Sequence, residues 1–395
     1  MSLLHIIDRL WMSARGRAIL SLWSTLLLLT SCVDEFQADL PSSDTDMLVV
    51  EGSIVSGKGC MFNLSHTVAL DGEYTDTTIP TYEATLTVRG SDGSEWKGAD
   101  IGGGSFWVSV GTLDAQVSYG VTIVWKGRTY TSEMQRPIVT PEIDRLDYYL
   151  SGNGPYVDIL LSTSAIDGMK TGESCYVWTC EECWEVNTPF KTYFDYDART
   201  DKVAAEPRDM SRGWCVVHRA PLMGTNADYD DGAIAGRRLM QMSKDDKRFS
   251  TLYSILVEQR AISMAEYEYR NLLEKQSTGM GGLFTPQPTS LPGNITCESS
   301  SSHKAIGYVG VSAGVTTKRL FVSRKQAGYV EQRPLEYLTP EEKADYEQWE
   351  LYAKNYRVYD IDPFDGPMWC ARWCNDCTDP YWGVTTRTCP DFWPQ

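Results

Sequence analysis

Long apolar stretches and basic residues are both scarce in this sequence. After residue 29 no apolar run reaches the length of about 20 residues that a transmembrane helix needs. The chain has 36 basic against 53 acidic residues, and such a surface repels the phosphates of nucleic acids. We therefore expect neither an internal membrane span nor nucleic-acid binding.

Histidines and local catalytic motifs are also scarce. The sequence has four histidines and contains no nucleophile elbow of the G-x-S-x-G type, no H-E-x-x-H zinc helix and no Walker loop. His66, His218 and His303 are scattered along the chain, although a triad assembled from distant positions is recognised only by its geometry. We predict a non-catalytic protein without cofactor or bound metal, and keep a hydrolase as the less favoured alternative.

The amino-terminal residues have the pattern of a lipoprotein signal. Three arginines precede an apolar core over residues 18–29, and Leu29-Thr30-Ser31-Cys32 closes this core with small residues and a cysteine. A core of about 12 residues is too short for a transmembrane anchor. The pattern predicts a signal peptide over residues 1–31, with Met12 as an alternative start, and acylation of Cys32 with palmitate-type chains. Two or three acyl chains give stable membrane attachment.

Removal of this signal makes the chain more acidic. Residues 1–31 contain three arginines and one aspartate, so the net charge changes from −17 to −19. Residues 32–46 are polar and acidic with proline and serine, which is typical of a tether between a lipid and a folded domain.

Ten cysteines remain after Cys32, and an even number in an exported chain favours disulfides. Zinc is the alternative, because Cys180-x-x-Cys183 and Cys370-x3-Cys374-x2-Cys377 have the spacing of metal ligands. Side chains alternate along a strand, so Cys180 and Cys183 are expected on opposite faces. The disulfide candidates are Cys60, Cys175, Cys180, Cys183, Cys215, Cys297, Cys370, Cys374, Cys377 and Cys389.

Short β-branched segments separated by turn residues predict a mainly β fold. In the first part the candidate strands are Leu48–Ile54, Met61–Thr67, Ala84–Val88, Ser105–Val110 and Val117–Trp125. Their length and spacing indicate an immunoglobulin-like β-sandwich over residues 47–138. A larger β-rich domain with two helices and a cysteine-rich carboxyl-terminal tail is predicted over residues 139–395. Its clearest strands are Tyr156–Ser162, Tyr176–Val186 and Ala305–Val322.

The first predicted helix covers residues 264–275. Ser263 is a suitable N-cap, and Glu266 three residues later completes a capping box. Ile262 before the cap can pack on Tyr267 as a hydrophobic staple.

The second predicted helix covers residues 340–354. Thr339 and Glu342 form its capping box, with Pro340 in the first helical position. A helix would place an aromatic stripe on one face, which is more often core packing than a ligand platform. The stripe consists of Tyr346, Trp349, Ala353 and Tyr356.

Two acidic clusters have the oxygen ligands that calcium prefers, but neither fits the twelve-residue calcium loop. A solvated loop is the favoured interpretation of both. The first cluster is Asp195, Asp197 and Asp201, and the second is Asp228, Asp230 and Asp231 before Gly232.

Five short blocks together resemble one family. They are Leu48–Gly52, Tyr253–Gln259, Ala265–Tyr269, Gly293–Ile295 and Cys389–Trp393. In this order after a lipoprotein signal, they resemble the Bacteroidota outer-membrane lipoproteins of domain-of-unknown-function family number 4249. The chain departs from the family in its cysteine-rich segment 175–183, which puts the disulfide pattern in doubt.

The resemblance implies a location and a partner. Members of the family are encoded beside TonB-dependent outer-membrane transporters, which implies an accessory lipoprotein that binds such a barrel during substrate uptake. The family supplies no catalytic residues. Asp34 and Glu35 resemble a surface-export signal, although ordinary solvation of a tether explains them too. We expect a surface-exposed outer-membrane lipoprotein, with a structural subunit of an outer-membrane complex as the alternative.

Overall fold

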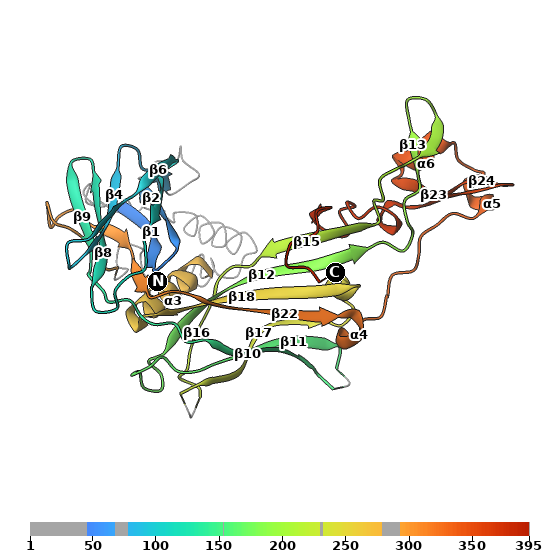
Figure 1. Cartoon of the computed structure of the whole chain (residues 1–395). Helices are drawn as coiled ribbons and strands as arrows, with labels where there is room; N and C mark the ends of the chain where they lie inside the picture. Colours follow the sequence, from blue (N-terminus) through green and yellow to red (C-terminus); the bar gives the residue numbers. More distant parts are fainter. Residues whose placement is uncertain (1–45, 68–77, 153, 230–231, 279–292, 395) are drawn as a thin grey trace, which may run out of the picture. The chain divides into compact units, whose positions relative to one another are not determined.

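The computed structural model describes residues 46–67, 78–152, 154–229, 232–278 and 293–394. The chain is mainly β, as the sequence predicts, with several sheets and few helices (Figure 1). None of the helices in the described part is long and apolar enough to cross a membrane. The predicted signal peptide and Cys32 lie outside the described residues.

Two sheets form a β-sandwich in the first part of the chain. The seven-stranded sheet has the order β20-β1-β2-β7-β6, with β21 paired to β1 and β3 paired to β2. The five-stranded sheet has the order β19-β9-β8-β4-β5. The strands are β1 Leu48–Val55, β2 Gly59–Thr67, β3 Thr78–Pro80, β4 Thr85–Gly90, β5 Glu95–Lys97, β6 Ala99–Gly102, β7 Ser105–Ser109, β8 Tyr119–Trp125, β9 Arg128–Ser132, β19 Ile295–Cys297, β20 Ala305–Gly307 and β21 Gly310–Ser312.

Alternation along the strands produces the core of this sandwich. Phe62 and Leu64 on β2 are buried, and so are Leu86 and Val88 on β4 in the other sheet. All four belong to one cluster of buried side chains between the sheets. The period of two therefore places apolar side chains inside and polar ones outside.

Three strands of the sandwich come from far along the chain. β20 and β21 both pair with β1 in parallel, and β19 pairs with β9. The Asn294 side chain holds this segment by accepting from the Val309 amide at 2.8 Å and donating to its carbonyl at 2.9 Å. The range predicted for the sandwich, 47–138, does not contain these strands.

The prediction of one strand over residues 305–322 is wrong. The segment contains β20 and β21 in the first sandwich and then β22, Thr316–Ser323, in a different sheet. Gly307 and Gly314 have φ values of 144° and 152°, which favour glycine and allow the chain to change direction between the strands.

A second pair of sheets follows. The six-stranded sheet has the order β22-β18-β12-β15-β25, with β16 paired to β12, and the three-stranded sheet has the order β10-β11-β17. Buried side chains from both sheets form one core cluster. The elements are β10 Ile143–Leu150, β11 Tyr156–Thr163, β12 Cys175–Asn187, β15 Arg212–His218, β16 Leu222–Thr225, β17 Ile234–Ser243, η1 Lys247–Phe249, β18 Leu252–Ile262, α4 Arg324–Ala327 and β25 Thr385–Thr386.

Helix α3, Met264–Thr278, begins where the sequence predicts. The Ser263 hydroxyl accepts from the Glu266 amide at 3.1 Å, and Ile262 and Tyr267 belong to one hydrophobic cluster. The Glu266 carboxylate also accepts from Arg260 at 2.7 Å and from Arg270 at 2.9 Å. This buried ion cluster joins the helix to the end of β18.

The C-terminal lobe consists of two hairpins and two short helices. β13 contacts β23, although the two strands are far apart in the sequence (Figure 1). Four buried residues form the core of the lobe: Tyr196, Leu351, Val358 and Trp369. The elements are β13 Phe194–Asp197, β14 Lys202–Ala205, α5 Pro340–Lys343, α6 Gln348–Ala353, β23 Tyr356–Asp362, β24 Gly366–Ala371 and the following η3 Arg372–Cys374.

The region predicted as a second helix differs in detail. The capping box of Thr339 and Glu342 is present, but α5 ends after one turn and Glu347 caps the separate helix α6. Asn355 has a φ of 69°, so the chain leaves the helix before Tyr356 enters β23. The predicted aromatic stripe does not form a core face, because 56% of Trp349 is exposed.

Candidate functional site

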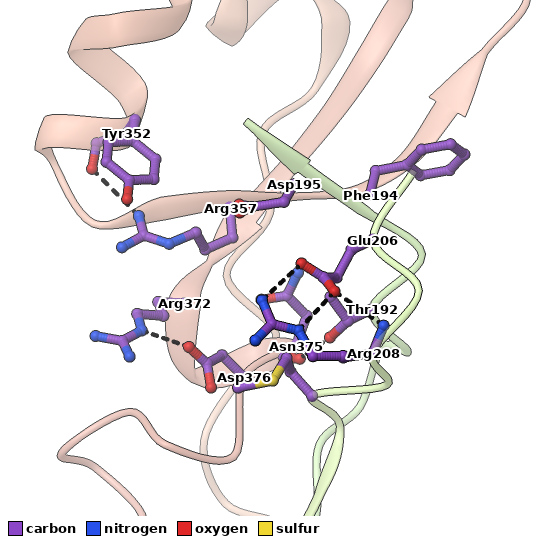
Figure 2. A pocket seen from close by; sticks show the side chains of 11 residues that line it. Thr192, Phe194, Asp195, Glu206, Arg208, Tyr352, Arg357, Arg372, Asn375 and Asp376 are labelled. Atoms are coloured by element: carbon purple, nitrogen blue, oxygen red, sulfur yellow. Dashed lines mark hydrogen bonds and ion pairs between the residues drawn. The ribbon is translucent and has the colours of Figure 1, made fainter. Parts of the chain in front are cut away.

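A cavity of about 320 Å³ opens in the C-terminal lobe (Figure 2). One wall comes from residues 192–210, around the β13–β14 hairpin, and the other comes from α6, β23 and the η3 turn. We call it the arginine cleft, because three arginines line it. The lining residues are Thr192, Phe194, Asp195, Glu206, Arg208, Met210, Tyr352, Arg357, Arg372, Asn375 and Asp376.

Two of the three arginines are neutralised inside the cleft. Arg208 contacts both carboxylate oxygens of Glu206, at 3.0 and 3.3 Å. The hydrogen bonds from Arg208 hold the pKa of Glu206 below its usual value. Arg372 donates to Asp376 at 2.7 Å and to the Thr378 hydroxyl at 2.8 Å. Each of these guanidinium groups therefore has a carboxylate of its own.

Arg357 has no such partner among the described residues, where no carboxylate lies within 4.0 Å of its nitrogens. Its Nη1 donates to the carbonyls of Tyr352 at 3.2 Å and Tyr356 at 2.7 Å. The guanidinium also lies over the Tyr352 ring, 4.1 Å from its centre. Burial lowers the pKa of Arg357, because it disfavours the charged form. Tyr352 raises this pKa, the Arg372 charge lowers it, and the carboxylates of Asp376 and Asp195 raise it.

Asn375 and Thr192 form a buried part of the lining. The Thr192 hydroxyl donates to the Asn375 carbonyl at 2.5 Å, and Asn375 Nδ2 donates to the Val358 carbonyl at 3.1 Å. Only 1% of Asn375 is exposed, and its Oδ1 has no hydrogen-bond partner in the described part of the chain. An unpaired buried acceptor of this kind costs free energy.

The cleft therefore combines guanidinium donors with carboxylate and amide acceptors. Figure 2 shows Tyr352, Arg357 and Arg372 along one side, with Glu206 and Arg208 across from them. Arginine binds planar anions through paired hydrogen bonds, and carboxylates accept from hydroxyl or ammonium groups. This chemistry suits the binding of a small polar ligand.

The three histidines that were considered for a catalytic triad lie on separate parts of the chain. His66 is on β2 and packs on Trp125, with ring centres 5.2 Å apart. His218 ends β15 and is exposed. His303 lines a second cavity of about 430 Å³ beside β19 and β20. None of the three lines the arginine cleft.

The first acidic cluster is divided between local turns and the arginine cleft. Asp195 lines the arginine cleft, whereas Asp197 accepts from the Arg199 amide at 2.9 Å and Asp201 accepts from the Tyr196 hydroxyl at 2.6 Å. In the second cluster, Asp230 and Asp231 lie outside the described residues. Within the described ranges, no group of three or more metal-binding side chains is placed to hold an ion.

All ten described cysteines are free thiols in this structure. Cys180 lies in the core between the two sheets and Cys183 on the opposite face of β12, as the alternation predicts. Burial raises the pKa of each of these two thiols to about 12. The Cys370 and Cys374 side chains contact each other, and a hydrogen bond between them raises the pKa of Cys370 and lowers that of Cys374.

The larger part of the sequence matches a known protein family. Residues 33–319 match a family described as a domain of unknown function, DUF4249. The chain belongs to the DUF4249 family. The match includes the predicted blocks up to residue 295, whereas the block Cys389–Trp393 lies beyond it. The search of curated proteins found no match.

Among solved structures, one match is a DUF4785 family protein from Legionella pneumophila. The identity is 9%, the TM-score is 0.18, and the alignment covers 54% of this chain and 52% of that one. The chain thus spans about half the length of that structure. With so low a TM-score, the likeness carries no argument about function.

The arginine cleft joins residues inside and outside the DUF4249 match. Its first wall lies within residues 33–319, and the second wall, which includes Arg357 and Arg372, follows the match. Nothing in the local sequence around these arginines marks them as site residues. Only contact between segments about 150 residues apart reveals them together.

Proposed function

We propose that the protein is a surface-exposed outer-membrane lipoprotein that assists a TonB-dependent transporter without catalysing a reaction itself. One observation carries the proposal: the DUF4249 match begins at Val33, the residue directly after the predicted lipidation site. The lipid would therefore be attached immediately before the family domain. The resemblance to lipoproteins encoded beside TonB-dependent transporters supplies the partner.

A lipid at Cys32 would confine the protein to the plane of the membrane. Confinement raises the effective concentration of a neighbouring barrel, so modest intrinsic affinity is enough for stable occupancy. The arginine cleft would be the ligand site, since an open polar cavity on a rigid β scaffold is where binding residues are commonly found. Export also implies an oxidising compartment, in which we propose that Cys370 and Cys374 form a disulfide.

The test of the anchor is Cys32→Ala. This variant should leave the membrane fraction or remain unprocessed, because the acyl acceptor is lost. The matched control is Cys389→Ala, which removes another cysteine that is exposed and free. The control should fractionate with the outer membrane like the unaltered protein. Membrane fractionation that is unchanged in Cys32→Ala contradicts the anchor.

The test of the partner is crosslinking in intact cells. Crosslinking should recover a TonB-dependent barrel with the unaltered protein and much less of it with Cys32→Ala. Deleting the gene for either partner should impair the same uptake phenotype. A structural subunit without a ligand predicts the same crosslink but no uptake defect. Hydrolysis of a polymer by the purified protein, with no barrel recovered, supports the hydrolase and contradicts the accessory function.

A further inference from the structure

Among the described residues, Arg357 is the arginine of the cleft that makes no ion pair. Half-buried charged groups in proteins are normally paired, because partial loss of water is unfavourable for an ion. Arg372, whose side chain is 27% exposed, follows this rule through Asp376. Arg357 lines the same cleft with two backbone carbonyls and one aromatic ring as its partners. Among the described residues its guanidinium therefore makes no direct ion pair, which the carboxylate of a ligand would supply.

The position of Arg372 indicates where that anion binds. Arg372 and Arg357 line the same cleft and lie along the same side of it (Figure 2). Because Arg372 uses Nε for Asp376 and Nη2 for Thr378, its Nη1 stays available. Arg357 likewise uses only Nη1 for the two carbonyls. An anion between the two guanidinium groups relieves their mutual repulsion and occupies these donors.

The charged residues of the cleft favour a ligand with a single negative charge. Three arginines are matched by three acids, Asp195, Glu206 and Asp376, so the lining is neutral as a whole. The complete chain has a net charge of −17. A dianion such as phosphate would therefore be repelled more than a singly charged carboxylate.

The acceptors in the cleft define the rest of the ligand. The exposed carboxylate of Asp195 accepts from the Tyr196 amide through Oδ1, and this bond leaves Oδ2 available. Asn375 Oδ1 is an acceptor without a partner among the described residues. The accessible Asp195 oxygen calls for a donor, which hydroxyl and ammonium groups provide and a simple fatty acid does not.

We propose that the arginine cleft binds a small, singly charged carboxylate that also carries hydroxyl or ammonium donors, with the carboxylate between Arg357 and Arg372. This inference rests on the proposed function only in assigning the cleft as its ligand site. A sugar acid and a free amino acid share this chemistry. A cavity of about 320 Å³ is large enough for either.

The experiment is calorimetric titration of the purified full-length lipoprotein in detergent micelles. D-glucuronate is compared with D-glucose, and L-alanine with L-alaninamide, because the members of each pair differ in the carboxylate. Inorganic phosphate is the fifth probe. At least one of the two carboxylates should bind at a single site. Its affinity should be about tenfold or more higher than that of the paired analogue without the carboxylate, and also higher than that of phosphate. The glucuronate and alanine arms identify which source of the carboxylate is used.

Variants assign the binding to the cleft. Arg357→Gln should weaken carboxylate binding about tenfold or more, and Arg357→Lys should retain part of it because the charge remains. Arg208→Gln should have a smaller effect, since Glu206 already neutralises that arginine. The control is Arg333→Gln outside the cleft, where Arg333 pairs with Glu336 and lies over Trp373. Circular dichroism of each variant establishes that it is folded.

Three results would overturn the proposal. They are the absence of binding by either carboxylate, binding of phosphate or a neutral analogue with equal affinity, and unchanged affinity in both Arg357→Gln and Arg372→Gln. The titration needs no barrel, so a failed crosslink in cells leaves it intact. A failed titration likewise leaves the result of the crosslinking experiment intact.

Discussion

The N-terminal sandwich and the C-terminal lobe bury their apolar side chains in different ways. The sandwich packs two sheets of regularly alternating strands around a large apolar cluster. The lobe has short hairpins around four buried residues, and much of its surface toward the arginine cleft is charged. Apolar burial is the main favourable contribution to folding, and the lobe has a much smaller buried apolar cluster than the sandwich.

The largest effect is expected from truncation inside the sandwich. Phe62→Ala removes a completely buried ring and should lower the free energy of unfolding by about 3–5 kcal/mol. Denaturant unfolding followed by circular dichroism measures it. The control is Phe364→Ala in the lobe, where 95% of the side chain is exposed, and its effect should stay within about 0.5 kcal/mol. Equal changes in the free energy of unfolding for Phe62→Ala and Phe364→Ala would contradict the role of the buried cluster of the sandwich in stability.

A smaller and more local effect is expected in the lobe. Trp369→Ala should lower the free energy of local opening by about 3 kcal/mol, the low end for a buried tryptophan, because a small cluster relaxes more easily. Amide hydrogen exchange should accelerate in β23 and β24 and stay unchanged in β2 and β8. Trp349→Ala, at a position that is 56% exposed, is the control. Faster exchange throughout the sandwich would show that the two regions unfold together.

The smallest effect is expected from the Cys370–Cys374 bond beside the cleft. A disulfide that closes so short a loop should stabilise the folded chain by about 2 kcal/mol. Peptide mapping of the protein isolated from membranes without reductant should recover the two cysteines joined. In the native protein Cys389 should react with an alkylating reagent at pH 8, whereas Cys183 should not, because burial raises its pKa to about 12. Separate, alkylated Cys370 and Cys374 in the denatured, unreduced protein would rule the bond out.

The fold of the sandwich was largely predictable because its signals are local. The strands expected at residues 48–54 and 105–110 occur as β1, Leu48–Val55, and β7, Ser105–Ser109. Each of them is a short run rich in β-branched or aromatic residues. The start of α3 was equally readable, since Ser263 stands directly before the helix and bonds to the Glu266 amide.

Long-range pairing was not predictable in the same way. Residues 305–312 have the apolar character of a buried strand, but nothing in them indicates a partner some 250 residues earlier. The arginine cleft was not predicted for the same reason. Arg357 resembles any surface arginine in the sequence, and only its position among carbonyls, Tyr352 and Arg372 distinguishes it.

The parallel pairing of β1 with β20 and β21 has a consequence for the order in which the protein folds. The first strand of the sandwich pairs with strands that are synthesised about 250 residues later. Until residue 312 is available, the β1 backbone on that side is an open edge, which is a template for pairing with other chains. Contacts of such long sequence separation also slow folding. The sandwich is therefore completed late, and a chaperone that binds the unpaired edge would protect it in the meantime.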